Sequence, residues 1–129
     1  MNTPNPEDVH TRFAELFAAK DLDGLMTLYE PDATLLPEPG VQITGLAVIR
    51  EALAAFLAMN GTFRMPAGKP IVAKDLALIF SEWTLDMTGP DGQPATLSGQ
   101  TSDVLRRQVD GNWRIVIDSP FGAGGVQGL

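Results

Sequence analysis

One acidic residue in the second half of the chain, Asp103, stands where a carboxyl group could act as an acid. It lies in an alternating segment, and Gly99, Thr101 and Leu105 share its face at two-residue spacing. If that face is buried, desolvation raises the pKa of the Asp103 carboxyl, because burial disfavours the charged form. A neutral carboxylic acid can donate a hydrogen bond to a developing oxyanion, a contribution on the order of 10²–10³ in rate. Alternatively, Asp103 bonds Thr101, Ser81 or the backbone, or it faces solvent because the alternation is out of phase by one residue.

The segments beside Asp103 predict an apolar pocket wall. In the preceding alternating segment one face carries Ile79, Ser81, Trp83, Leu85 and Met87. In the last segment Trp113, Ile115 and Ile117 share a face, and Met59 and Met65 could fill the same space. Trp83 is then either a stacking wall for a ligand or a core residue.

His10, the only histidine, does not indicate a metal site. It falls in the first turns of a helix that looks exposed, with no second histidine and no tight carboxylate cluster beside it. We therefore predict neither a metal nor another cofactor.

Three helices are predicted in the first half of the chain. Asn5 and Asp21 are the expected N-caps of the first two, and Pro31 stops the second. Asn60 and Gly61 are expected to end the third. The three helices span about residues 6–20, 22–29 and 45–60.

From residue 71 onward the apolar pattern alternates, which is typical of strands. Turn residues separate four predicted strands, at 71–73, 76–87, 95–109 and 113–118. A short strand is expected at 33–36, an irregular segment at 37–40, and a tail after Phe121 that is mobile unless a partner subunit holds it. Helices followed by hairpins predict one α+β domain over residues 1–129, with three helices packed on a curved antiparallel sheet.

Composition narrows the range of partners. The 129-residue chain carries a net charge of −7, no cysteine, and no run of Lys or Arg. A nucleic-acid partner and an anionic membrane surface are therefore not expected, and thiol chemistry is excluded. The first residues lack the features of a signal peptide and no apolar run is long enough to span a membrane, so a cytoplasmic location is expected.

Three segments resemble the nuclear transport factor 2-like (NTF2-like) superfamily, whose fold is a cone. They are AKDLDGLMTLYEPDATL at 19–35, GLAVIRE at 45–51 and VLRRQVDGNWRI at 104–115. The last is similar to the closing hairpin of the SnoaL-like and DUF4440-like branch, and IDSPFG at 117–122 resembles the YybH-like subgroup. The resemblance implies a cavity between the helices and the curved sheet.

A more distant similarity to ketosteroid isomerases implies only part of their site. Their oxyanion-hole aspartate falls on Asp103, their oxyanion-hole tyrosine on Phe13, and their general-base aspartate on Pro37. Neither Phe13 nor Pro37 can do the corresponding chemistry, so orthodox ketosteroid isomerisation is not expected. Glu38 is a candidate replacement base by a shift of its loop, or otherwise a solvated loop acid.

The sequence therefore predicts a protein that binds a small apolar or polycyclic molecule. One hypothesis is a cofactor-independent isomerase- or cyclase-type enzyme, with Asp103 as the acid and Glu38 as the candidate base. The other is a non-catalytic association module that resembles the association domain of calmodulin-dependent kinase II. The predicted ligand contacts are Phe13, Met59, Ser81, Trp83, Thr101 and Ile117.

A homodimer is expected through the outer face of the sheet, where Phe80, Val104 and Val116 are predicted to lie. Cross-strand ion pairs on that face are expected from Glu82, Arg106, Arg114 and Asp118.

Overall fold

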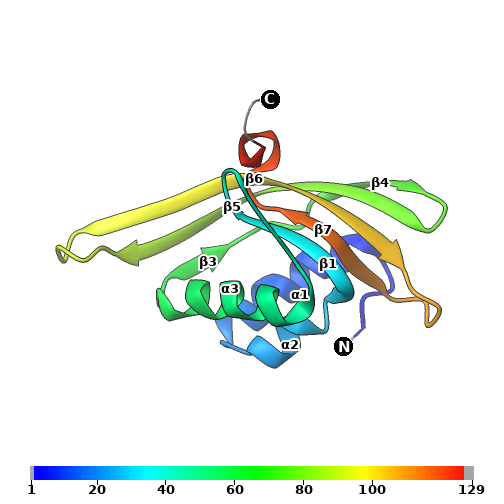
Figure 1. The fold of residues 1–129 in the computed structure, drawn as a ribbon, viewed down its shortest axis with the longest axis horizontal. Coiled ribbons are helices and arrows are strands. Elements are labelled where there is room, and N and C mark those ends of the chain that lie inside the picture. Colours follow the sequence, from blue (N-terminus) through cyan, green and yellow to red (C-terminus); the bar gives the residue numbers. More distant parts are fainter. Residues whose placement is uncertain (1, 127–129) are drawn as a thin grey trace.

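Three helices lie on one face of a single curved sheet (Figure 1). A computed structural model describes residues 2–126. The helices are α1 (Pro6–Ala18), α2 (Leu22–Met26) and α3 (Leu46–Ala58). Within residues 2–126, no helix is both long and apolar enough to cross a membrane.

Both predicted N-caps are present. The Asp8 carboxylate accepts a hydrogen bond from the Asn5 N–H at 2.8 Å at the start of α1. The Asp21 carboxylate accepts one from the Gly24 N–H at 2.9 Å at the start of α2. The prediction that α2 reaches Tyr29 is wrong, because the chain after Met26 turns to pair with the last strand.

The sheet contains seven strands. They are β1 (Tyr29–Glu38), β2 (Val41–Thr44), β3 (Thr62–Arg64), β4 (Lys69–Ala73), β5 (Leu76–Thr88), β6 (Pro94–Arg107) and β7 (Trp113–Ser119). Their order is β2-β1-β7-β6-β5-β3, with β4 beside β5. The β1–β7 pair is parallel and the other pairs are antiparallel, so the curved sheet is mixed. The α+β fold is confirmed.

The first strand differs most from its predicted extent. It starts four residues earlier than expected, and Pro37 and Glu38 belong to it rather than to an irregular loop. The short strands β2 and β3 were not predicted. After β7, the 3₁₀ helix η1 (Gly122–Gly125) lies on the opposite side of the sheet from α1–α3 (Figure 1). The tail therefore has regular structure as far as Gly125, while 127–129 fall outside the described residues.

The predicted alternation of β5 and β6 has the correct phase. Alternate residues of these strands face the helices and are at least 95% buried: Ala77, Ile79, Trp83, Leu85, Thr101, Asp103 and Leu105. The apolar residues among them join Val9, Leu25, Ile49 and Ile115 in one core between the helices and the sheet.

The alternation of β7 reverses at a β-bulge. Leu105 pairs with Ile115, but Val104 pairs with Ile117, so one additional residue of β7 is accommodated between them. Ile117 is consequently 40% exposed and Asp118 only 8% exposed. The prediction that Ile117 lines the inner face is wrong, and so is the prediction that Asp118 forms an ion pair on the outer face.

Candidate active site

A narrow cavity lies between the helices and the sheet. Its walls are mostly aromatic and aliphatic, and include Phe13, Phe17, Phe56, Phe63, Met65 and Trp83. His10, Thr101, Asp103 and Asp118 also line it and form a connected polar cluster. The cavity volume is about 60 Å³, room for a few water molecules rather than for a whole ligand. It does not accommodate the polycyclic molecule expected from the sequence.

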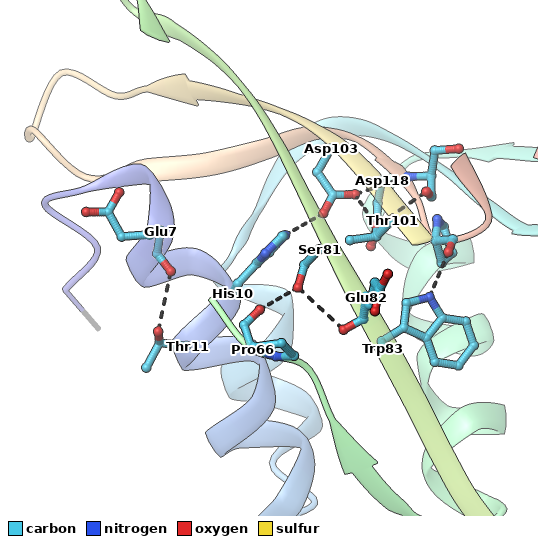
Figure 2. A network of polar contacts seen from close by, with 12 residues as sticks. Glu7, His10, Thr11, Pro66, Ser81, Glu82, Trp83, Thr101, Asp103 and Asp118 are labelled. Carbon is cyan, nitrogen blue, oxygen red and sulfur yellow. Dashed lines mark hydrogen bonds and ion pairs between the residues drawn. The ribbon is translucent and has the colours of Figure 1, made fainter. Parts of the chain in front are cut away.

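The centre of the polar cluster is a contact between α1 and β6. His10 Nε2 lies 2.7 Å from Asp103 Oδ2, and Figure 2 shows the two side chains pointing toward each other. Both residues are almost fully buried, at 1% and 3% exposure. The other Asp103 oxygen accepts hydrogen bonds from the Thr101 hydroxyl at 2.9 Å and the Ser119 N–H at 3.2 Å.

The second ring nitrogen of His10 has no partner. Among residues 2–126, Nδ1 is the one buried side-chain nitrogen or oxygen without a hydrogen bond. A buried polar atom of this kind is costly to leave unpaired, so its presence beside a cavity calls for a functional or solvent partner.

A second carboxyl group lies next to Asp103. Asp118 is the cross-strand partner of Asp103 between β6 and β7, and the two carboxyl groups are within hydrogen-bonding reach. The Tyr29 hydroxyl, from the first residue of β1, donates a hydrogen bond to Asp118 Oδ2 at 2.5 Å. The cluster thus joins α1, β1, β6 and β7.

Burial shifts the protonation equilibria of this cluster. Desolvation lowers the pKa of His10 to about 4, although Asp118, where it is ionised, opposes the decrease. Desolvation raises the pKa of Asp103 to about 6, although hydrogen bonds from Asp118, Thr101 and Ser119 oppose the increase. Burial, together with the neighbouring Asp103 charge, raises the pKa of Asp118 well above its ordinary value.

These shifts define the charge state near neutral pH. The imidazole of His10 is neutral, Asp103 is a carboxylate, and Asp118 retains its proton. His10 Nε2–H therefore donates to Asp103, and Nδ1 carries the free lone pair. Burial also raises the pKa of Tyr29 well above its ordinary value, so its phenol remains a donor.

Four of the predicted site residues line the cavity: Phe13, Trp83, Thr101 and Asp103. Trp83 is 5% exposed, and its indole N–H donates to the Pro120 carbonyl at 2.7 Å, which holds the ring in place. Thr101 serves Asp103 as a hydrogen-bond donor.

The other four predicted site residues do not line it. Glu38 is exposed at the end of β1, and Met59 is 41% exposed beyond α3. The Ser81 hydroxyl donates a hydrogen bond to the Pro66 carbonyl and lines a separate pocket near η1. Ile117 faces outward because of the bulge in β7.

Sequence reasoning missed His10, Asp118 and Tyr29 as members of the cluster. His10 precedes Phe13 by three residues and Phe17 by seven, and this spacing places all three on one helical face. That signal was available, and the prediction that His10 is exposed is wrong. No comparable pattern in the sequence predicts that Asp118 faces the core, because its inward orientation depends on the bulge. Within residues 2–126, no group of three His, Cys, Asp or Glu side chains could hold a metal ion.

The chain belongs to the SnoaL-like domain family, whose profile matches residues 10–116. Comparison with curated protein sequences found no significant match. Its fold is the NTF2-like cone, as solved structures of similar shape show.

Three of these structures come from different bacteria. A candidate dehydratase of the NTF2-like family from Streptomyces avermitilis is 19% identical, with a TM-score of 0.72 over 87% of this chain and 91% of that one. A candidate ketosteroid isomerase from Shewanella frigidimarina is 17% identical, with a TM-score of 0.71 over 87% and 90%. A candidate calcium/calmodulin-dependent protein kinase type II association domain from Thiobacillus denitrificans is 21% identical, with a TM-score of 0.73 over 93% and 98%. At these identities the similarity establishes the fold alone, and the narrower YybH-like assignment stays a prediction.

Proposed function

We propose that this protein is an enzyme of proton transfer, an isomerase or a dehydratase, that acts on a small and largely apolar molecule. The observation that supports this function is the buried His10–Asp103 contact of 2.7 Å, which leaves His10 Nδ1 without a partner. The chemistry needs only side chains of the cluster. The candidate dehydratase and isomerase of similar fold are consistent with this class of reaction.

His10 is the general base in this proposal. Asp103 accepts the Nε2 proton in a hydrogen bond, which fixes the tautomer and aims the lone pair of Nδ1 away from the carboxylate. When Nδ1 takes a proton from a carbon of the substrate, the resulting imidazolium is stabilised by the adjacent Asp103 carboxylate. General-base catalysis contributes roughly 10²–10⁴ in rate. Asp103 thus becomes the partner of the base rather than the acid predicted from the sequence.

The lining of the cavity defines the class of substrate. The walls are aromatic and aliphatic, and neither Lys nor Arg is among the lining residues. A carboxylate or phosphate would therefore be buried without a cation, which is strongly unfavourable. We infer an uncharged substrate with a hydrocarbon ring or chain and one hydroxyl or carbonyl oxygen.

An association module is the less favoured function. Assembly through a sheet face does not need four buried ionisable side chains, whose desolvation lowers stability. The related prediction of a homodimer is kept, because Phe80 and Ile117 expose 47% and 40% of their surface on the side of the sheet away from the core. Native mass spectrometry gives the subunit count and reveals any small molecule that remains bound.

The base assignment is tested by nitrogen-15 NMR of His10. Because His10 is the only histidine, its two ring nitrogens give unambiguous signals. We expect a neutral ring at pH 7 with the proton on Nε2, and a pKa well below the ordinary 6.5. In Asp103→Asn the fixed Nε2–H tautomer should be lost, since an amide can donate as well as accept. A ring that is protonated at pH 7, or that carries its proton on Nδ1, would refute the proposal.

A further inference from the structure

We propose that Asp118 is the acid that works opposite His10, and that Tyr29 is the residue that positions it. The inference rests on the proposed function, because it assigns the proton donor that isomerisation or dehydration requires beside a base. Asp118 lines the same cavity as His10, and both side chains are buried.

The β-bulge in β7 is the structural device that brings Asp118 into the site. Without the bulge between Ile115 and Ile117, strict alternation from Trp113 would direct Asp118 to the outer face. With it, Asp118 lies directly across from Asp103 on β6. Bulges of this kind commonly re-aim a side chain next to an active site.

Two facing buried carboxyl groups cannot both be ionised at low cost. Besides Asp118 itself, the hydrogen-bond donors to Asp103 are the His10 imidazole, the Thr101 hydroxyl and the Ser119 N–H, and the donor to Asp118 is the Tyr29 hydroxyl. None of these is a fixed cation. Since like charges at contact distance disfavour each other, the pair retains one proton. Asp103 already accepts three hydrogen bonds, which favour its charged form, so the proton resides on Asp118.

Tyr29 determines which oxygen of Asp118 carries that proton. Its hydroxyl donates to Oδ2, and the ring is 1% exposed and held by the pairing of Tyr29 with Ile115. Because Oδ2 is occupied as an acceptor, the acidic proton is on Oδ1. Tyr29 does not line the cavity, so it acts on the substrate only through Asp118.

The proton balance of a dehydration illustrates the roles. His10 Nδ1 takes a proton from the substrate carbon, and the electron pair of that C–H bond becomes the new C=C bond. The C–O bond breaks with its electrons on oxygen, which takes the Oδ1 proton of Asp118 and leaves as water. The imidazolium and the Asp118 carboxylate together hold as many protons as before. Return of the additional proton of His10 to Asp118 restores the site without an external acid or base.

Infrared spectroscopy of the protein without substrate tests this assignment. We expect the wild-type protein at pH 7 to show the C=O stretch of one protonated carboxyl group. The band should be lost in Asp118→Asn and retained in Asp110→Asn, which removes a fully exposed carboxylate. In Tyr29→Phe the band should shift to higher frequency and persist to higher pH, because the hydrogen bond to the carboxyl oxygen is lost.

Three outcomes would overturn the inference: no band in the wild-type protein at pH 7, a band that survives Asp118→Asn, or a band in Tyr29→Phe with unchanged frequency and pH midpoint. If Asp118→Asn does not fold, the spectra of the wild-type protein and of Tyr29→Phe still show whether Asp118 carries the proton. The failure of this inference is distinguishable from that of the proposed function. If the Asp118 band is missing and the imidazole is neutral with its proton on Nε2, only the assignment of Asp118 as the acid is refuted. If the imidazole is protonated, the assignment of His10 as the base is refuted.

Discussion

At the scale of single residues, the cluster of His10, Asp103, Asp118 and Tyr29 is unfavourable for folding and favourable for proton transfer. Four ionisable side chains are at most 8% exposed, and their partners are hydrogen-bonding groups instead of Lys or Arg. Burial raises the pKa values of both carboxyl groups above their ordinary value, and strongly perturbed pKa values of this kind cluster at functional sites. The same arrangement makes the free energy of unfolding depend on pH, because these groups titrate at ordinary pKa values in the unfolded chain and at shifted ones in the folded state.

The variant Asp118→Asn isolates this pH dependence. Above the ordinary carboxyl pKa the unfolded chain has lost the Asp118 proton while the folded state retains it up to its own raised pKa, so the free energy of unfolding falls as pH rises between the two, by up to about 1.4 kcal/mol per pH unit. His10 and Asp103 also titrate differently in the folded and unfolded states, but both remain in the variant, so the difference in slope between the two proteins reports on Asp118. Urea unfolding at several pH values should show the slope in the wild-type protein and not in the variant. An equal slope in both would mean that Asp118 is ionised in the folded state.

At the scale of elements, the regular patterns were predictable and the irregularities that build the site were not. Capping residues placed the starts of α1 and α2, and alternation placed the inner face of β5 and β6 correctly, including Asp103. The bulge in β7 has no signature in a sequence whose apolar residues continue at two-residue spacing through Ile117. The spacing of Tyr29 predicts a helix, whereas its burial and its pairing with β7 decide its conformation.

The β5–β6 pair has one position where the backbone must stay free of a side chain. A Cβ at Gly99 would lie 2.6 Å from the Pro120 carbonyl oxygen and 2.9 Å from the Trp83 indole nitrogen. We expect Gly99→Ala to disrupt the hydrogen bond between Trp83 and Pro120 and to destabilise the fold by about 1–3 kcal/mol. Gly124→Ala is the matched control, since a Cβ there meets nothing within 4 Å. Thermal unfolding of both variants checks the prediction, which fails if Gly99→Ala is as stable as the control.

At the scale of the whole molecule, the fold places helices over a curved sheet. The cavity enclosed between them is too small to hold the proposed substrate. The α+β cone was predictable from the order of helices and hairpins, but the volume of its cavity was not, because volume depends on how individual rings pack. Phe13, Phe17 and Phe63 contact one another, and Phe63 stacks on Trp83 with ring centroids 6.1 Å apart. A ligand must therefore displace part of the lining.

Met65 is the lining side chain best suited to move. It is half-buried in the segment after β3, and an unbranched thioether changes rotamer more easily than a packed ring. We expect Met65→Ala to bind benzyl alcohol about three- to tenfold more tightly than the wild-type protein, because the ring no longer has to displace the Met65 side chain. Met59→Ala should have no such effect, since Met59 is exposed and does not line the cavity.

Benzoate provides the charge control for the same measurement. It matches the shape of benzyl alcohol, but it would bring a carboxylate toward Asp103 and Asp118 with no lining cation to neutralise it. Its affinity should be at least about tenfold weaker in every variant. Titrations are followed by the His10 imidazole signals, since His10 lines the cavity and a ligand bound there lies beside it. Equal binding of the two probes would contradict an uncharged substrate, and equal affinity of Met65→Ala and Met59→Ala for benzyl alcohol would mean that another side chain opens the cavity.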